Sequence, residues 1–119
     1  HYAFQVTVIN GKLNLLWNQR SVDTMLGLPF NIASYALLLH LLAKECKLGE
    51  GKLVGFLADT HIYQNHLEGA REQITRDPNT YPLPKIITEN FTSIFDWQYT
   101  DSKIIGYESH PNIKFQIAI

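Results

Sequence analysis

The fold is decided by residues 2–17, which read YAFQVTVINGKLNLLW. Within them Asn10-Gly11 lies between two runs of apolar and β-forming residues, and this pair tolerates the positive φ angles of a type I′ turn. Apolar side chains occur on both faces of the two runs, so neither run has a fully polar face. The sequence therefore predicts a β-hairpin, residues 2–9 paired with residues 12–17, in a sheet that is covered on both sides.

The next long apolar stretch, residues 29–47, predicts a helix. Pro29 suits the first helical turn, where its missing N–H costs nothing, and Gly49 stands just past the far end. The stretch leaves almost no polar face, which is typical of a helix that is buried on most sides. We expect it to be the central core helix. In it we expect Cys46 to be a small buried hydrophobe and His40 a hydrogen-bonded core residue.

The remaining sequence holds shorter elements around a proline-rich loop. Residues 52–58 read as a strand and residues 65–76 as an amphipathic helix. The expected inner stripe of that helix is His66, Leu67, Ala70 and Ile74. Three short strand candidates follow the prolines, at residues 85–88, 93–99 and 103–107. We see no repeat or linker, so residues 1–119 read as one α+β domain with a mixed β-sheet and a long buried central helix.

Composition limits the class of protein. Ten basic and eleven acidic residues give a net charge of −1, which favours neither nucleic acid nor a membrane surface as a partner. Hydrophobic residues make up 45% and charged residues 18% of the chain, which argues against disorder. A single cysteine excludes an internal disulfide framework and a cysteine-rich zinc site. No apolar run reaches the roughly 18–20 residues that cross a bilayer, and the amino end reads as a strand instead of a signal peptide. We therefore expect a cytoplasmic protein.

The most informative stretch for chemistry is residues 19–31, which read QRSVDTMLGLPFN. Arg20 beside Ser21 offers a charge and a hydroxyl for a phosphate group. Asn31 offers two donors and an acceptor, which suit the edge of a nucleobase. A plainer alternative is also open, in which Arg20 pairs with Asp23 and Asn31 starts the helix.

A second candidate is residues 59–66, which read DTHIYQNH. If this stretch is extended, His61 and Tyr63 point the same way and can hydrogen-bond one ligand group, such as a sugar hydroxyl. His61 and His66 also suggest zinc. Their spacing is not that of a helical ligand pair, however, and no second cluster completes a site, so we expect no metal.

These stretches together resemble one known family. Residues 19–23 and 27–35, QRSVD and GLPFNIASY, closely resemble the signature region of thymidylate synthase. Residues 59–66 resemble that family's second block, and the ending from His110-Pro111 to Ile119 resembles its carboxyl terminus. The resemblance runs over the whole chain in the right order and covers the carboxyl-terminal part of a subunit, somewhat under half. It implies a thymidylate synthase-like two-layer α/β fold for residues 1–119.

The resemblance also implies an activity and its ligands. The family converts dUMP to dTMP and uses 5,10-methylenetetrahydrofolate as both one-carbon donor and reductant. Its complete subunits form homodimers, and the resemblance implies no metal, DNA or membrane partner. The substrate-binding residues that it implies are Gln19, Arg20, Ser21, Val22, Asp23, Asn31, His61, Ile62 and Tyr63.

Within this implied set, Arg20 and Ser21 would bind the phosphate of dUMP. Asn31 would read the uracil edge, and its amide would favour uracil over cytosine. His61 and Tyr63 would hold the 3′-hydroxyl of the deoxyribose.

The resemblance further implies a folate side and a catalytic set. The residues implied at the folate are Asp23, Gly27, Phe30, Ala118 and Ile119. The implied catalytic residues are Asn31, Asp23 and His1, and Gln19 would help to order the pocket.

The nucleophile of the family is a cysteine in a Pro-Cys-His motif, and His1 matches the histidine of that motif. We therefore expect the nucleophilic cysteine to belong to an amino-terminal portion outside this sequence, and we expect Cys46 not to replace it. Two other functions are open. One is a deoxyuridylate hydroxymethylase, which shares the pocket but quenches the methylene with water. The other is a non-catalytic nucleotide-binding or interaction module.

Overall fold

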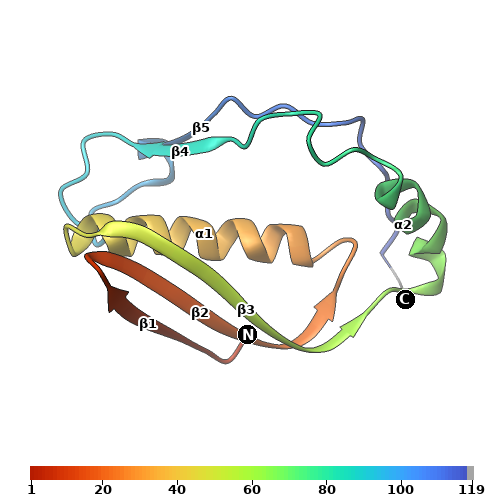
Figure 1. The fold of residues 1–119 in the computed structure, drawn as a ribbon, viewed down its shortest axis with the longest axis horizontal. Coiled ribbons are helices and arrows are strands. Elements are labelled where there is room, and N and C mark those ends of the chain that lie inside the picture. Colours follow the sequence, from red (N-terminus) through yellow and green to blue (C-terminus); the bar gives the residue numbers. More distant parts are fainter. Residues whose placement is uncertain (118–119) are drawn as a thin grey trace.

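The computed structural model describes residues 1–117, which form a three-stranded sheet, a long helix and a smaller β-ribbon (Figure 1). The sheet has the order β1 (Ala3–Ile9), β2 (Lys12–Asp23), β3 (Gly49–His61). β1 runs antiparallel to β2, whereas β3 runs parallel to β2, and helix α1 (Leu28–Glu45) makes the crossover between the parallel strands. The expected α+β architecture, with a mixed sheet and one long helix, is confirmed.

The first hairpin is confirmed in its turn and its pairing. Asn10 and Gly11 have φ angles of 51° and 72°, as a type I′ turn requires at both central positions. Ile9 pairs with Lys12 across this two-residue loop. Both strands beyond the turn are therefore set in register by local sequence.

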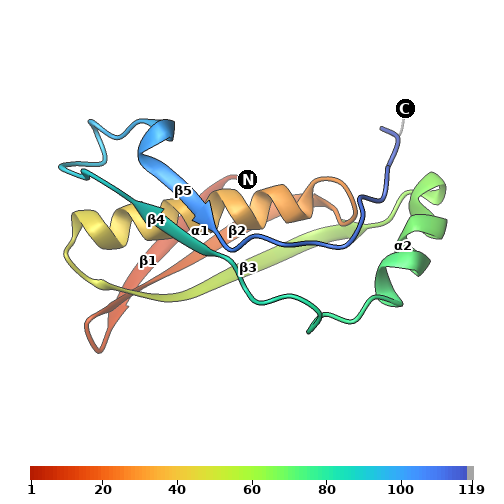
Figure 2. The ribbon, with the colours of Figure 1, turned by 90° about the horizontal axis from the view of Figure 1, so that it is seen from above.

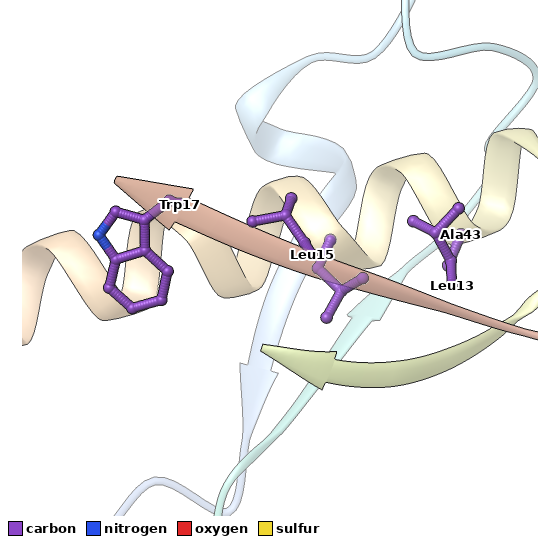
Figure 3. Packing of buried hydrophobic residues seen from close by; sticks show 5 residues of the cluster. Leu13, Leu15, Trp17 and Ala43 are labelled. Atoms are coloured by element: carbon purple, nitrogen blue, oxygen red, sulfur yellow. The ribbon is translucent and has the colours of Figure 1, made fainter. Parts of the chain in front are cut away.

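The core lies between α1 and one face of the sheet. Alternate residues of β2 (Leu13, Leu15 and Trp17) are buried against Leu39 and Ala43 of the helix (Figure 3). Full burial of a side chain of this size contributes roughly 1.5–3 kcal/mol. This layer fixes α1 along β2 and so fixes where the helix begins relative to the end of that strand.

Within residues 1–117 the chain itself covers the sheet on one side only, so the predicted cover of the second side does not come from these residues. On the face away from α1, Leu16, Val54 and Phe56 are exposed. On the α1 face, the outer strand β1 is exposed along its whole length. A helix is about 10 Å across, and strands lie about 4.8 Å apart, so one helix covers only about two strands.

The ends of α1 differ from the prediction. Pro29 does lie in the first turn, but the helix ends at Glu45, and Lys47 instead of Gly49 takes the left-handed conformation, with φ 53°. The Leu48 N–H donates to Ala43 O at 2.9 Å, which closes the turn as in a Schellman motif. Cys46 caps this end and is exposed, so its predicted burial is wrong. The helix is buried only in its second half, at Leu39, His40, Leu41 and Ala43.

A two-stranded ribbon, β4 (Lys85–Thr88) and β5 (Ser102–Ile105), crosses α1 on the side away from the sheet (Figures 1 and 2). His40 joins the helix to it. Its Nδ1 lies 2.6 Å from Glu50 Oε1, and its Nε2 lies 2.8 Å from Thr88 Oγ1. The Thr88 and Ser102 hydroxyl oxygens lie 2.7 Å apart. His40 is therefore the hydrogen-bonded core residue that the sequence predicts.

The strand predicted at residues 93–99 is wrong. Ser93 Oγ accepts from the Phe95 N–H, and Ser93 O accepts from the Asp96 N–H, so this stretch turns. A short helix, η2 (Tyr99–Asp101), follows. Serine and aspartate side chains that bond the nearby backbone compete with strand pairing, which explains the difference.

Several predicted elements differ in extent. β2 continues past the predicted residue 17 to Asp23, and β5 covers Ser102–Ile105 instead of residues 103–107. β3 is longer than residues 52–58, and the helix at residues 65–76 is divided into η1 (Gln64–His66) and α2 (Leu67–Ile74). Of the expected inner stripe, His66 is buried and Ala70 is half-buried, but Leu67 and Ile74 are exposed. None of the helices within residues 1–117 is long and apolar enough to cross a membrane.

Candidate functional site

The candidate residues gather where the parallel strands β2 and β3 end and α1 begins. The register pairs Ser21 with Asp59 and Asp23 with His61, so the two predicted stretches lie side by side. The Thr24 N–H donates to His61 O at 3.1 Å and ties the strand ends together. Ligand sites in sheets with parallel strands typically lie beyond such carboxyl ends. The fold therefore brings together residues that are about forty positions apart in the sequence.

Among the described residues 1–117, no strand pairs with one edge of β2 at this end. The last residue of β2 with a partner on β1 is Asn18, whereas β2 continues to Asp23. Arg20 and Ser21 are both exposed on this segment. Adjacent side chains of a strand point to opposite faces of the sheet, so Arg20 and Ser21 cannot both reach a ligand that lies on one face. They can both reach a ligand that lies beside the unpaired edge of the strand.

The buried amide of Gln19 sets the orientation of Asn31. Gln19 Nε2 donates to Asn31 Oδ1 at 2.9 Å and to Ser21 O at 3.1 Å, while Trp17 Nε1 donates to Gln19 Oε1 at 3.2 Å. Indole N–H only donates, so this chain of bonds fixes which end of each amide carries the oxygen. Asn31 therefore holds its oxygen toward Gln19 and keeps its two N–H donors for another partner.

The alternative reading of these residues is wrong. None of the ion pairs within residues 1–117 joins Arg20 to Asp23. Asn31 does not cap the helix, because the N-cap is Gly27 and the helix starts at Leu28. Asp23 instead organises the turn into α1, since its Oδ1 accepts the N–H groups of Met25 and Leu26 at 3.2 and 3.1 Å.

The prediction that His61 and Tyr63 share one side is confirmed. Their rings meet edge to face with centroids 5.0 Å apart. His61 Nδ1 lies 3.2 Å from Asp59 O, which only accepts, so Nδ1 carries a proton and Nε2 is left to bond a ligand. Ile62, between them, is exposed.

The residues expected at the folate lie partly along a groove. Phe30 is 71% exposed and lines a groove of about 1230 Å³ between the start of α1, the proline-rich loop and residues 107–116. Gly27 is the N-cap of α1, and Val22 is fully buried beneath the site. Ala118 and Ile119 lie outside the described residues.

His1 packs against the first half of α1, whereas Cys46 lies at the other end of the helix. The His1 ring stacks on Tyr35 with centroids 5.3 Å apart, and Tyr35 stacks on Trp17 at 5.0 Å. Tyr35 lies one helical turn after Asn31, on the same face of α1. Cys46 lies fifteen residues after Asn31, about 22 Å away along a helix that rises about 1.5 Å per residue.

Sequence reasoning missed two residues at this site. Trp17 anchors Gln19, and His66 is fully buried with its Nδ1 3.8 Å from Asp23 Oδ1. His66 lies within the stretch 59–66, but apart from Tyr63 its neighbours Asp23, Phe115 and Gln116 lie far away in the chain. Within residues 1–117, no three His, Cys, Asp or Glu side chains gather in a way that could hold a metal ion.

Comparison with known proteins identifies the family. A family model described as thymidylate synthase matches residues 1–119. A bifunctional dihydrofolate reductase-thymidylate synthase of Paramecium tetraurelia is 49% identical over 119 residues, which are 100% of this chain and 25% of that protein. A thymidylate synthase of Mycoplasma pneumoniae (strain ATCC 29342 / M129 / Subtype 1) is 46% identical over 119 residues, again 100% of this chain and 41% of that protein. The chain thus spans well under half the length of these two relatives. It belongs to the thymidylate synthase family.

Proposed function

We propose that this chain forms the dUMP-binding wall of a thymidylate synthase, which converts dUMP to dTMP with 5,10-methylenetetrahydrofolate. The observation that supports this best is the fixed amide of Asn31. Its N–H donors suit O4 of uracil, and its oxygen, with a second lone pair beside the Gln19 bond, suits the uracil N3–H. Cytosine presents the opposite pattern, so the same amide disfavours it.

The other two parts of dUMP have matching groups nearby. Arg20 and Ser21, at the end of β2, would bind the phosphate through charge and hydrogen bonds. His61 and Tyr63 would hold the 3′-hydroxyl, because their rings lie together at the end of β3. Base, sugar and phosphate would then bind along one line across the ends of β2 and β3.

The folate would lie along the groove at the start of α1. Phe30 offers an exposed aromatic face there, and Gly27 and Asp23 form the turn beside it. Within residues 1–117, backbone N–H groups donate to Oδ1 of the Asp23 carboxylate. Its Oδ2 would serve the pterin, while Ala118 and Ile119 would complete the folate side. The bound folate supplies the one-carbon unit and the hydride.

Attack at C6 of uracil needs a covalent nucleophile, because binding alone does not make C5 reactive. Cys46 is too far from Asn31 to serve. We therefore assign the nucleophile to a cysteine elsewhere in the complete protein, next to His1, whose ring stacks on Tyr35, a residue one helical turn after Asn31. The relatives are longer than this chain, which supports this assignment.

We also propose that complete subunits pair through the open face of the sheet and work in the cytoplasm. Leu16, Val54 and Phe56 line this face and are exposed. An apolar sheet face of this kind is typical of an interface between subunits. Substituting Val54→Lys should shift the complete protein from dimer to monomer in sedimentation, and an unchanged mass would contradict this assignment.

The proposed activity is tested by incubating the complete protein with dUMP and 5,10-methylenetetrahydrofolate. We expect dTMP and dihydrofolate to form in equal amounts. Asn31→Ala should lower kcat/KM by about 100-fold or more, since two hydrogen bonds to the base are lost. Asn79→Ala, in an exposed loop turn, is the control and should leave turnover unchanged. Absence of dTMP with the wild-type protein would overturn the proposal.

A further inference from the structure

The carboxyl-terminal residues 113–116 dock against η1 and α2 through a small set of contacts. His66 Nε2 lies 2.6 Å from Gln116 O, and Asn65 Nδ2 donates to the same oxygen at 3.3 Å. The Phe115 ring meets the His66 ring edge to face, with centroids 5.1 Å apart. Phe115 also packs so closely on Gly69 that an added Cβ would clash with it.

The imidazole of His66 has different neighbours on its two nitrogens. A carbonyl oxygen only accepts, so Nε2 carries a proton and donates to Gln116 O. Nδ1 lies 3.8 Å from Asp23 Oδ1, at the turn that leads into α1. The same ring also touches the edge of Tyr63, with centroids 5.6 Å apart. One rigid ring therefore contacts residues 115–116 on one side and two candidate ligand-binding residues on the other.

The buried polar atoms without a hydrogen-bond partner also lie around Asp23. Within residues 1–117 they are His66 Nδ1 and Thr24 Oγ1, and Thr24 directly follows Asp23. Such atoms are few in folded proteins and call for an explanation beyond stability. His66 Nδ1 lies 3.8 Å from Asp23 Oδ1, so the ring limits where that carboxylate can move without bonding to it. The arrangement favours a role in holding Asp23.

We infer that His66 is a positioning residue, which couples the docking of residues 113–116 to the carboxylate of Asp23. When Gln116 O is bound, the ring cannot rotate, and Nδ1 stays against Asp23. When residues 113–116 leave, the ring loses its anchor, and Asp23 loses a fixed neighbour. The expected effect on KM for the folate rests on the proposed function, which puts Asp23 at the folate. The docking of residues 113–116 by His66 does not depend on that function.

Two substitutions distinguish the roles of the two ring nitrogens of His66. His66→Gln puts an amide N–H near the place of Nε2 and can still donate to Gln116 O, whereas His66→Asn puts its amide near Nδ1 and cannot reach Gln116. We expect amide hydrogen exchange of a peptide covering residues 111–117 of the complete protein to speed up about ten-fold in His66→Asn, the effect of losing one hydrogen bond. His66→Gln should restore exchange to within about three-fold of wild type. Arg71→Gln, at an exposed position of α2, is the control and should change nothing.

The kinetic test compares the change in KM for the folate with the change in Kd for dUMP. In His66→Asn, KM for 5,10-methylenetetrahydrofolate should rise about ten-fold. Kd for dUMP should rise less, because Arg20 and Asn31 are untouched and Tyr63 loses only its edge contact with the His66 ring. Gly69→Ala keeps His66 but displaces Phe115, so it should also speed exchange and raise the same KM.

Three results would overturn the inference. One is wild-type exchange in His66→Asn, another is equal loosening in His66→Gln and His66→Asn, and the third is an unchanged folate KM in Gly69→Ala when exchange has risen. If instead the wild-type protein makes no dTMP, the proposed function fails, and the exchange measurements still decide whether His66 docks residues 113–116.

Discussion

Gln19 Nε2 donates a hydrogen bond to Asn31 Oδ1 at 2.9 Å and thereby joins the buried face of β2 to the first turn of α1. Gln19 is almost fully buried, and its oxygen is held by the indole of Trp17. The orientation of the Asn31 amide is thus set from inside the core. A residue that would read a base is fixed before any ligand arrives, which lowers the entropic cost of binding.

Gln19→Glu tests this relationship. A carboxylate cannot donate, so the Asn31 amide should rotate and direct its N–H groups to residue 19. We expect Kd for dUMP to rise about 10- to 100-fold, and the preference for dUMP over dCMP to shrink, in calorimetric titrations of the complete protein. Gln98→Glu, the same change at an exposed position before η2, is the matched control. An unchanged ratio of the two affinities would show that Gln19 does not orient Asn31.

Arg20→Lys tests the phosphate site. A guanidinium binds phosphate through two parallel N–H groups, whereas an ammonium acts as a point charge. Kd for dUMP should therefore rise about ten-fold or more, while the weaker affinity for deoxyuridine, which lacks the phosphate, should stay the same. Equal losses for both ligands would mean that Arg20 acts on something other than phosphate.

His40→Ala tests the attachment of the β4–β5 ribbon to α1. The substitution removes one of the two hydrogen-bond partners of the buried Thr88 hydroxyl, and the free energy of unfolding should fall by about 2–4 kcal/mol in urea titrations. Hydrogen exchange should speed up most in β4 and β5. Glu50→Gln keeps an acceptor for His40 Nδ1 at a half-exposed position and should cost less than about 1 kcal/mol. Equal effects of the two substitutions would contradict this role of His40.

Gly55→Ala tests the close contact between the parallel strands. A Cβ at residue 55 would lie 2.5 Å from Trp17 Cη2, so the indole must move. We expect the free energy of unfolding to fall by about 1–3 kcal/mol, and dUMP affinity to fall with it, because Trp17 holds Gln19. Gly11→Ala is a control that meets no neighbour and is strained only by its φ of 72°. It should cost about 1–2 kcal/mol of stability and leave dUMP affinity unchanged.

Local sequence predicted the elements whose geometry is set within a few residues. Asn10-Gly11 specifies its turn because both residues tolerate positive φ, and Pro29 marks the first turn of α1. The exposure of Cys46 could not be read in the same way. The continuous apolar run ends at Ala43, and Cys46 stands among Lys44, Glu45 and Lys47. Its exposure is set by the left-handed Lys47, whose conformation no residue type in this stretch marks.

The part of the candidate site that depends on local residue types was also predicted from the sequence. Residue types at 19–31 and 59–66 indicated nucleotide chemistry, and the parallel register of β2 and β3 brings the two stretches together. The role of His66 depends on Gln116, fifty residues later, and on a contact with Asp23 that no periodicity encodes. Such contacts arise only when the whole chain packs.

The central claim is that the ends of β2 and β3 and the start of α1 bind one molecule of dUMP. It is tested most directly by a crystal structure of the complete protein with dUMP. The account predicts the uracil edge within hydrogen-bond distance of the Asn31 amide, the phosphate at Arg20 and Ser21, and the 3′-hydroxyl at His61 and Tyr63. A dUMP molecule bound elsewhere, or one that reaches Arg20 while Asn31 stays out of contact with its base, would contradict the account.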